Sequence, residues 1–106
     1  MTSSLKLIYT TVSTEEAAVD IIRTLLDERL VACGNIIPVV RSIYRWEGDV
    51  CDEREVAFML KTARANSAKA MERLEELHPY DVPAIELWDV AGANLPFLNW
   101  VHKETA

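Results

Sequence analysis

Apolar and polar positions recur along this chain with two different periods, and the period predicts the type of each element. Residues 36–62 predict one long β-hairpin. Its outgoing arm, residues 36–46, is dense in β-branched and aromatic residues, which suit a half-buried pleated surface. Its returning arm, residues 55–62, alternates in side-chain direction. One face of that arm carries Val56, Phe58 and Leu60, and the other carries Glu55, Ala57, Met59 and Lys61.

The tip of this hairpin and one irregularity in it also follow from the residue types. Glu47-Gly48-Asp49 supplies the turn, because glycine takes a positive φ without a Cβ clash. Residues 50–54 either continue the pairing or form a wider loop, and the register stays open. Pro38 removes one donor from the ladder, which predicts an edge position or a bulge.

The residues before the hairpin predict a strand and a helix. Residues 5–12 are rich in β-forming side chains and lead into a helix-start signal. Ser13 and Glu16 have the spacing of a capping box, and apolar residues then recur at helical spacing up to Leu30. We expect residues 31–35 to close this helix through a left-handed glycine or asparagine.

The residues after the hairpin predict a second helix, a strand and a third helix. Asn66 or Ser67 is expected to cap the second helix, and Pro79 to end it. Residues 84–90 alternate and predict the last strand, and residues 95–102 predict a short terminal helix with a proline in its first turn.

The resulting order of elements indicates an α+β, ferredoxin-like (split βαβ) fold in one domain, residues 1–106. Both main helices are expected on one face of an antiparallel sheet, which leaves the other face open. The long hairpin and the open face predict self-association, because exposed strand edges pair with other chains. Tyr44 and Trp46 near the hairpin tip, together with Trp100, are the candidate interface residues.

Composition excludes several kinds of partner. Seventeen acidic and eleven basic residues give a net charge of −6, which disfavours nucleic acid and anionic membranes. No apolar run is long enough to span a bilayer, and the N-terminal residues lack the pattern of a signal peptide, so the cytoplasm is expected. The sequence also contains no nucleophile motif, no phosphate-binding glycine loop and no zinc-site spacing. No enzymatic activity is therefore predicted.

Five motifs together resemble the CutA divalent-cation-tolerance proteins. They are Ala32-Cys33 followed by Asn35-Ile36, Tyr44-Arg45-Trp46-Glu47-Gly48, Leu60-Lys61-Thr62, His78-Pro79-Tyr80-Asp81-Val82-Pro83 and Phe97-Leu98-Asn99-Trp100. The resemblance covers nearly the whole chain. It implies a ferredoxin-like subunit in a tight homotrimer similar to the trimers of PII signalling proteins. It also implies a link to tolerance of copper and other divalent cations, without an established enzymatic activity.

The resemblance also raises one candidate metal ligand, His78. Some family members are described as binding copper through a cysteine in the first strand and two histidines ahead of the proline. Here those positions hold Thr10, Leu77 and His78, so only one imidazole remains, and one imidazole alone makes a weak copper site. His78 is either a copper ligand or a hydrogen-bonded structural histidine at a helix C-terminus, where the helix dipole favours a cation.

Four residues at element ends are candidate ligand-binding residues: Trp46, Glu55, Lys61 and Tyr80. Glu55 and Lys61 lie about 20 Å apart at the rise of a strand, too far for a direct pair within one chain. Lys61 in a cleft between subunits, with Tyr80 and Trp46, suits a small anionic or aromatic ligand. Alternatively, Lys61 and Glu55 form salt bridges at an interface and the aromatic side chains are packing anchors.

Three functions remain open at this point. The first is a non-enzymatic homotrimer for copper tolerance or response, with copper or another divalent cation as its possible ligand. The second is a trimer resembling PII proteins that senses a small molecule in clefts between subunits. The third is a structural trimer that anchors other proteins.

Overall fold

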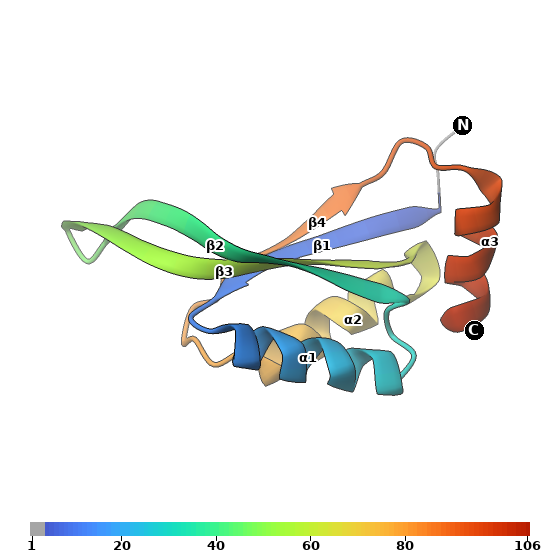
Figure 1. Ribbon diagram of the computed structural model, residues 1–106, viewed down its shortest axis with the longest axis horizontal. Helices are drawn as coiled ribbons and strands as arrows, with labels where there is room; N and C mark the ends of the chain where they lie inside the picture. Colours follow the sequence, from blue (N-terminus) through green and yellow to red (C-terminus); the bar gives the residue numbers. More distant parts are fainter. Residues whose placement is uncertain (1–3) are drawn as a thin grey trace.

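The computed structural model describes residues 4–106, which form an antiparallel sheet with two helices on one face (Figure 1). The strands are β1 (Leu5–Val12), β2 (Cys33–Trp46), β3 (Asp49–Ala63) and β4 (Ile85–Asp89), in the spatial order β2-β3-β1-β4. The helices are α1 (Glu15–Asp27), α2 (Arg64–Leu77) and α3 (Leu95–Glu104). This arrangement confirms the predicted α+β, ferredoxin-like class.

Strands β2 and β3 form the predicted long hairpin, which projects beyond the body of the molecule (Figure 1). Pairing runs from Cys33 opposite Lys61 to Trp46 opposite Asp49, so residues 50–54 continue the ladder and form no wider loop. Glu47 and Gly48 both have positive φ, 48° and 88°, as a two-residue hairpin turn requires.

Pro38 marks an irregularity in the edge strand β2. The register between β2 and β3 shifts between Ile37 and Val40, and β2 lies at the edge of the sheet. Both observations confirm the prediction for this proline, because a residue without an N–H cannot donate to a regular ladder.

The core lies between the sheet and helices α1 and α2. Val56, Phe58 and Leu60, which the alternation of the returning arm placed on one face, are all buried against the helices. Leu25 of α1 and Leu74 of α2 are likewise fully buried. Burial of these side chains stabilises the fold through the removal of apolar surface from water.

Helix α1 begins and ends at other residues than predicted. Thr14 is its N-cap, and the Thr14 Oγ1 atom accepts the N–H of Ala17 at 3.1 Å, so the expected capping box at Ser13 is wrong. The helix ends at Asp27, and Arg29 takes the left-handed conformation with φ 59°. The prediction that a glycine or asparagine among residues 31–35 closes the helix is therefore wrong.

Gly34 has a different role, in strand β2. A Cβ atom at this position would lie 2.8 Å from Ile22 Cγ2 and 2.9 Å from Ile22 Cγ1 and Cδ1. The glycine therefore lets the strand pass close to helix α1.

Helix α2 also begins earlier than predicted, at Arg64, and its N-cap, Ala63, makes no side-chain cap hydrogen bond. Asn66 and Ser67 lie inside the helix, so the prediction that one of them caps it is wrong. The Asn66 amide instead donates to the Thr105 carbonyl at 3.0 Å, which ties α2 to the end of α3. The helix ends at Leu77, two residues before Pro79, as predicted.

The sheet face opposite α1 and α2 stays open in the single chain. On this face Tyr9 and Trp88 stack with ring centroids 5.5 Å apart, and Trp88 is 45% exposed. Both cysteines, Cys33 and Cys51, are free. No helix within residues 4–106 has the length and apolar character needed to cross a membrane.

Candidate functional site

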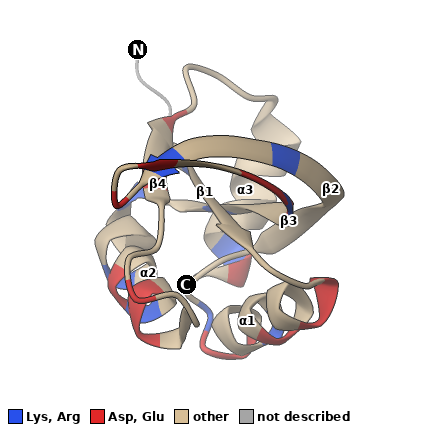
Figure 2. Cartoon of the chain, turned by 90° about the vertical axis from the view of Figure 1, so that its left-hand side faces the viewer, with Lys and Arg blue, Asp and Glu red and all other residues tan. Residues whose placement is uncertain are grey.

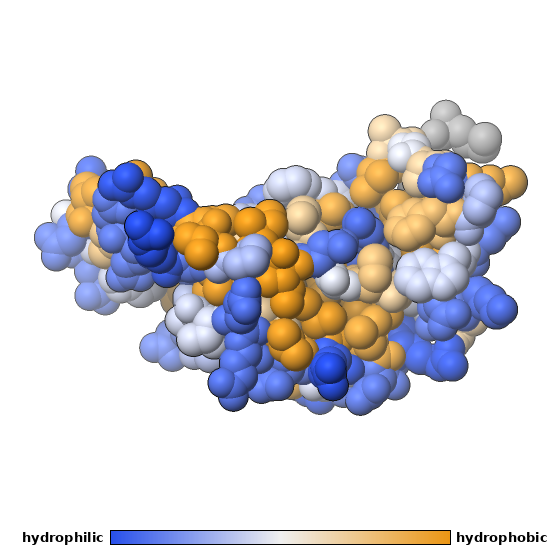
Figure 3. Space-filling model, in the orientation of Figure 1, coloured by the Kyte–Doolittle hydropathy of each residue, from blue (hydrophilic) through white to orange (hydrophobic). Residues whose placement is uncertain are grey.

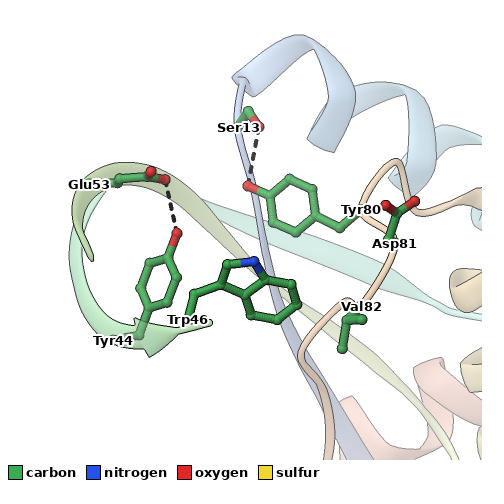
Figure 4. A pocket seen from close by; sticks show the side chains of 7 residues that line it. All are labelled: Ser13, Tyr44, Trp46, Glu53, Tyr80, Asp81 and Val82. Carbon is green, nitrogen blue, oxygen red and sulfur yellow. Dashed lines mark hydrogen bonds between the residues drawn. The ribbon is translucent and has the colours of Figure 1, made fainter. Parts of the chain in front are cut away.

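Two adjoining cavities lie between the hairpin and the connection from α2 to β4, and Figure 4 shows the first of them. The first has a volume of about 320 Å³ and is lined by Ser13, Tyr44, Trp46, Glu53, Tyr80, Asp81 and Val82. The second, of about 360 Å³, shares Tyr44, Tyr80 and Val82 with the first and also contacts Glu55. We call the two together the hairpin cleft. Each cavity falls at the small end of the range of roughly 300–1,000 Å³ that is typical of ligand sites.

The strand pairing explains why the hairpin side chains meet in this cleft. Tyr44 and Trp46 are two residues apart in β2 and therefore point to the same face of the sheet. Glu53 and Glu55 share that face, because they pair with Ser42 and Val40, which precede Tyr44 at the same period of two.

The opposite wall comes from the connection between α2 and β4. Its residues Tyr80, Asp81 and Val82 lie between Pro79 and Pro83, and the two prolines restrict the backbone on either side. Figure 4 shows the Tyr80 ring from this connection facing the same space as the Tyr44 and Trp46 rings from the hairpin.

Both tyrosine hydroxyls of the cleft donate to carboxylates of β3. The Tyr44 hydroxyl donates to Glu53 Oε2 at 3.1 Å, and the Tyr80 hydroxyl donates to Glu55 Oε2 at 2.7 Å. Because Tyr80 uses its proton in this way, the Ser13 hydroxyl, 3.1 Å away, donates to the Tyr80 oxygen. Ser13 thus contributes to the cleft and not to a helix cap.

These contacts raise the pKa of both phenols further above neutral pH. The hydrogen bond to Glu53, together with burial and the charges of nearby acidic groups, raises the pKa of Tyr44 to about 12. Burial and the contact with Glu55 raise the pKa of Tyr80, although its bond to Ser13 acts in the opposite direction. Each tyrosine therefore remains a hydrogen-bond donor at neutral pH.

The cleft carries negative charge that no basic side chain of residues 4–106 neutralises through an ion pair. Glu53, Glu55 and Asp81 form no ion pair with any residue within 4–106, where the acidic partners of ion pairs are Asp89, Asp52, Glu28 and Glu76. Figure 2, which views the molecule from the hairpin end, shows acidic residues along the hairpin and on both α1 and α2.

The structure does not bring Lys61 to the hairpin cleft. Its Nζ atom donates to Asn35 Oδ1 at 3.0 Å and lies 5.7 Å from the centre of the Phe97 ring. In β3 it lies near the end of the strand, beyond Glu55, so within one chain Lys61 does not join Tyr80 and Trp46. Their predicted grouping in a cleft between subunits stays a prediction. Trp100 lies near Lys61, stacked on Phe97 with a centroid distance of 5.9 Å. A ligand-binding role for Lys61 in another setting stays a prediction.

His78 is buried beside the cleft and hydrogen-bonded at both ring nitrogens. Its Nδ1 atom accepts the backbone N–H of Tyr80 at 3.2 Å, so the proton of the neutral ring is on Nε2. Nε2 lies 2.9 Å from the Thr11 carbonyl oxygen, to which it donates, and 3.1 Å from Thr10 Oγ1. Burial lowers the pKa of His78, although the Thr11 carbonyl and the Glu55 charge raise it.

This geometry bears on the two roles predicted for His78. The backbone N–H of His78 donates to the Leu74 carbonyl at 2.9 Å, so the residue does close the C-terminus of α2, but as a neutral ring and not as a cation. Within residues 4–106, no three His, Cys, Asp or Glu side chains converge as a metal site would require. The assignment of His78 as a metal ligand stays a prediction.

Several cleft residues were not singled out by sequence reasoning. Ser13 was interpreted as a helix cap, and Glu53 lay in the segment whose pairing was left open. Because side chains of a strand alternate between its two faces, Glu53 lies on the same face as Glu55 if residues 50–54 continue the strand. The sequence left that pairing open, so this signal for Glu53 could not be used. Asp81 was part of the quoted histidine-proline motif, yet nothing local to it indicated a cavity.

The fold and the cleft define a small ferredoxin-like α+β protein with an extended hairpin and an acidic, aromatic cleft. The chain belongs to the CutA1 divalent ion tolerance protein family, whose model matches residues 6–104. It is 43% identical to the divalent-cation tolerance protein CutA of Pyrococcus horikoshii, over 93% of this chain and 96% of that protein.

Solved structures of relatives agree closely with this fold. CutA1 from Ehrlichia chaffeensis superposes with a TM-score of 0.93 at 39% identity, covering 100% of this chain and 98% of that one. The periplasmic divalent cation tolerance protein CutA from Archaeoglobus fulgidus has a TM-score of 0.92 at 28% identity, with coverage of 96% and 99%.

Proposed function

We propose that this protein acts in divalent cation tolerance as a non-enzymatic homotrimer that responds to copper or a similar cation. The observation that carries the proposal is membership of the CutA1 family over nearly the whole chain. The cytoplasmic location expected from the sequence is part of the proposal. Because the Archaeoglobus fulgidus relative is named as periplasmic, cell fractionation with a periplasmic marker is the test of the compartment.

Exposed apolar surface on the hairpin supports self-association. Ile37, Val39 and Ile43 of the edge strand β2 are 39%, 57% and 62% exposed. Figure 3 shows apolar surface gathered at the base of the hairpin and continuing towards α1. An unpaired edge that carries apolar side chains favours association with another chain. The assignment of three copies follows from the family resemblance, and we place Tyr44, Trp46 and Trp100, which are also exposed, at the interface.

Copper binding by His78 would proceed through its Nδ1 atom. The Nε2 proton already donates to the Thr11 carbonyl, an arrangement in which a backbone carbonyl orients a metal-binding imidazole. Copper at Nδ1 would replace the Tyr80 N–H and would need further ligands from other subunits of the trimer.

Native mass spectrometry of the untagged protein, with and without Cu(II), tests both parts of this proposal. We expect the mass of a trimer and stoichiometric copper that is lost in His78→Ala. His102→Ala is the matched control, because the other histidine of the chain is exposed and lies at the far end in α3. A monomer or dimer would overturn the trimer. Equal copper retention in wild type and His78→Ala would overturn the ligand assignment.

The hairpin cleft favours a second function, the binding of a small molecule. It combines ligand-sized cavities with several polar groups converging among aromatic side chains, which is the usual composition of ligand sites. Detection of a bound small molecule by mass spectrometry after denaturation of freshly purified protein would support this function.

A further inference from the structure

We propose that the hairpin cleft, which borders the subunit interface proposed above, binds a small organic ammonium cation, an alkylamine with one or two positively charged nitrogens. The inference rests on the second function proposed above, the binding of a small molecule, and adds the chemical class of the ligand. Three features of the cleft carry it: its charge, its free hydrogen-bond acceptors and its aromatic walls.

The charge of the cleft selects a cation. Lys61, the residue that made an anionic ligand attractive, lies outside this cleft within one chain, beside Asn35 near the end of β3. The lining that residues 4–106 of one chain give to the two cavities contains Glu53, Glu55 and Asp81 but no Lys, Arg or His side chain. An anion here would meet like charges without a compensating partner, while a cation would neutralise them.

The carboxylates also retain acceptor capacity for N–H groups. Glu53 and Glu55 each use Oε2 to accept a tyrosine hydroxyl. Within residues 4–106 no hydrogen bond engages Oε1 of either glutamate or the carboxylate of Asp81. The tyrosine contacts hold the glutamates in place, and the free oxygens accept charge-assisted hydrogen bonds from an ammonium group.

The walls of the cleft suit the carbon chain of such a ligand. The rings of Tyr44 and Trp46 come from the hairpin and the ring of Tyr80 from the opposite connection, and all three border one space (Figure 4). Aromatic faces attract alkylammonium groups within about 6 Å of the ring centre, with tryptophan the strongest. Val82 adds apolar surface to the same wall.

The same geometry disfavours a bare metal ion in this cleft. A hard divalent cation needs several oxygen ligands within about 2.6 Å. The described residues contain no convergent group of three His, Cys, Asp or Glu side chains. An organic cation needs no such convergence, because it spreads its contacts over one or two nitrogens and a hydrocarbon chain.

The test is isothermal titration calorimetry of the full chain with pentane-1,5-diamine as the cationic probe. Pentan-1-ol, pentanoate and MgCl₂, at matched ionic strength, provide neutral, anionic and inorganic comparisons. We expect saturable binding of the diamine and at least about tenfold weaker binding of the other three, because one lost charged contact changes affinity by about that factor.

Two matched variants test whether the diamine binds in the hairpin cleft. Glu53→Gln removes the charge but keeps an oxygen that accepts the Tyr44 hydroxyl. We expect this variant to bind the diamine about tenfold more weakly than wild type. Glu47→Gln removes the same charge from the hairpin turn outside both cavities and is expected to bind the diamine as wild type does. Thermal melts confirm that both variants are folded.

Each contrary result has a separate meaning. Pentan-1-ol or pentanoate binding as tightly as the diamine would overturn the cationic class while leaving small-molecule binding in place. Stoichiometric displacement of the diamine by Mg²⁺ would overturn it in favour of a metal site. Equal diamine affinity in Glu53→Gln and Glu47→Gln would overturn the location. If none of the probes binds, the inference fails, and detection of a co-purifying molecule still decides the second function independently.

Discussion

Replacement of His78 by alanine is expected to destabilise the protein even when no metal is present. The imidazole is 7% exposed and joins three parts of the chain: the end of α2, the strand β1 and the start of the connection to β4. It accepts the N–H of Tyr80 and donates to the carbonyl of Thr11. Alanine keeps neither contact and leaves a space beside the hydroxyl of Thr10, a residue that is fully buried.

The size of this effect follows from the two backbone groups that lose their partner. A donor or acceptor left unsatisfied costs about 1–2 kcal/mol when it is only partly shielded from water. Two such groups lower the free energy of unfolding by about 2–4 kcal/mol. For a domain of this size the loss corresponds to a fall in melting temperature of roughly 10–30 °C.

Differential scanning calorimetry in the presence of a chelator measures this difference. All variants are compared at one protein concentration, because association of subunits also shifts the melting temperature. His78→Gln is expected to recover part of the stability, since an amide both donates and accepts. His102→Ala is the control: its imidazole makes one exposed contact, to the Ser4 hydroxyl, and the change is expected to stay within about 0.5 kcal/mol.

A melting temperature for His78→Ala equal to that of His102→Ala would refute the structural role. A deficit that appears only after copper is added would show instead that the histidine stabilises the protein through the metal. The same pair of variants therefore distinguishes the two roles that the sequence left open.

Two further predictions concern pH and packing. Because burial holds the pKa of His78 below its ordinary value of 6.5, the unfolded chain takes up the proton first as the pH falls. The stabilisation by neutral His78 is complete above the pKa of this residue in the unfolded chain, and it is lost as the pH falls towards the pKa in the folded protein. Below about pH 6.5 the melting temperature of wild type should therefore fall more steeply than that of His78→Gln. Parallel curves of melting temperature against pH would contradict this. Gly34→Ala should cost about 1–3 kcal/mol in urea unfolding, because the new Cβ would lie 2.8 Å from Ile22 Cγ2. Gly92→Ala is the control, because the space around Gly92 is open. The double variant Gly34→Ala with Ile22→Ala should lose less free energy of unfolding than the two single changes together. Strict additivity of the two losses would refute the clash.

Local chemistry determined much of the architecture of this protein. The alternation of Val56, Phe58 and Leu60 identified the buried face of β3, because side chains of a strand point to opposite faces at a period of two. Pro38 and Gly48 marked the bulge and the hairpin turn, since each residue restricts or permits backbone conformations by itself. The order of elements then led to the ferredoxin-like fold.

The helix ends show where local reasoning failed. Ser13 and Thr14 are both good N-cap residues. Thr14 caps the helix, while the Ser13 hydroxyl contacts Tyr80, sixty-seven positions away. Gly34 had the residue type of a helix C-cap, yet it lies in a strand where the close approach of Ile22 requires the absence of a side chain. For Gly34 a contact between distant segments decided the outcome.

The candidate site depended on tertiary structure most of all. The sequence by itself named Trp46, Glu55 and Tyr80 as candidate ligand-binding residues and Tyr44 as a candidate interface residue. Grouping the four required the register of the hairpin and the position of the connection after α2. The sequence also grouped Lys61 with Tyr80 and Trp46 in a cleft between subunits, and within one chain Lys61 instead lies beside Asn35. Which charged side chains one chain brings to the cleft therefore depended on the fold, because strand pairing, and not residue type, sets which distant side chains share a cavity.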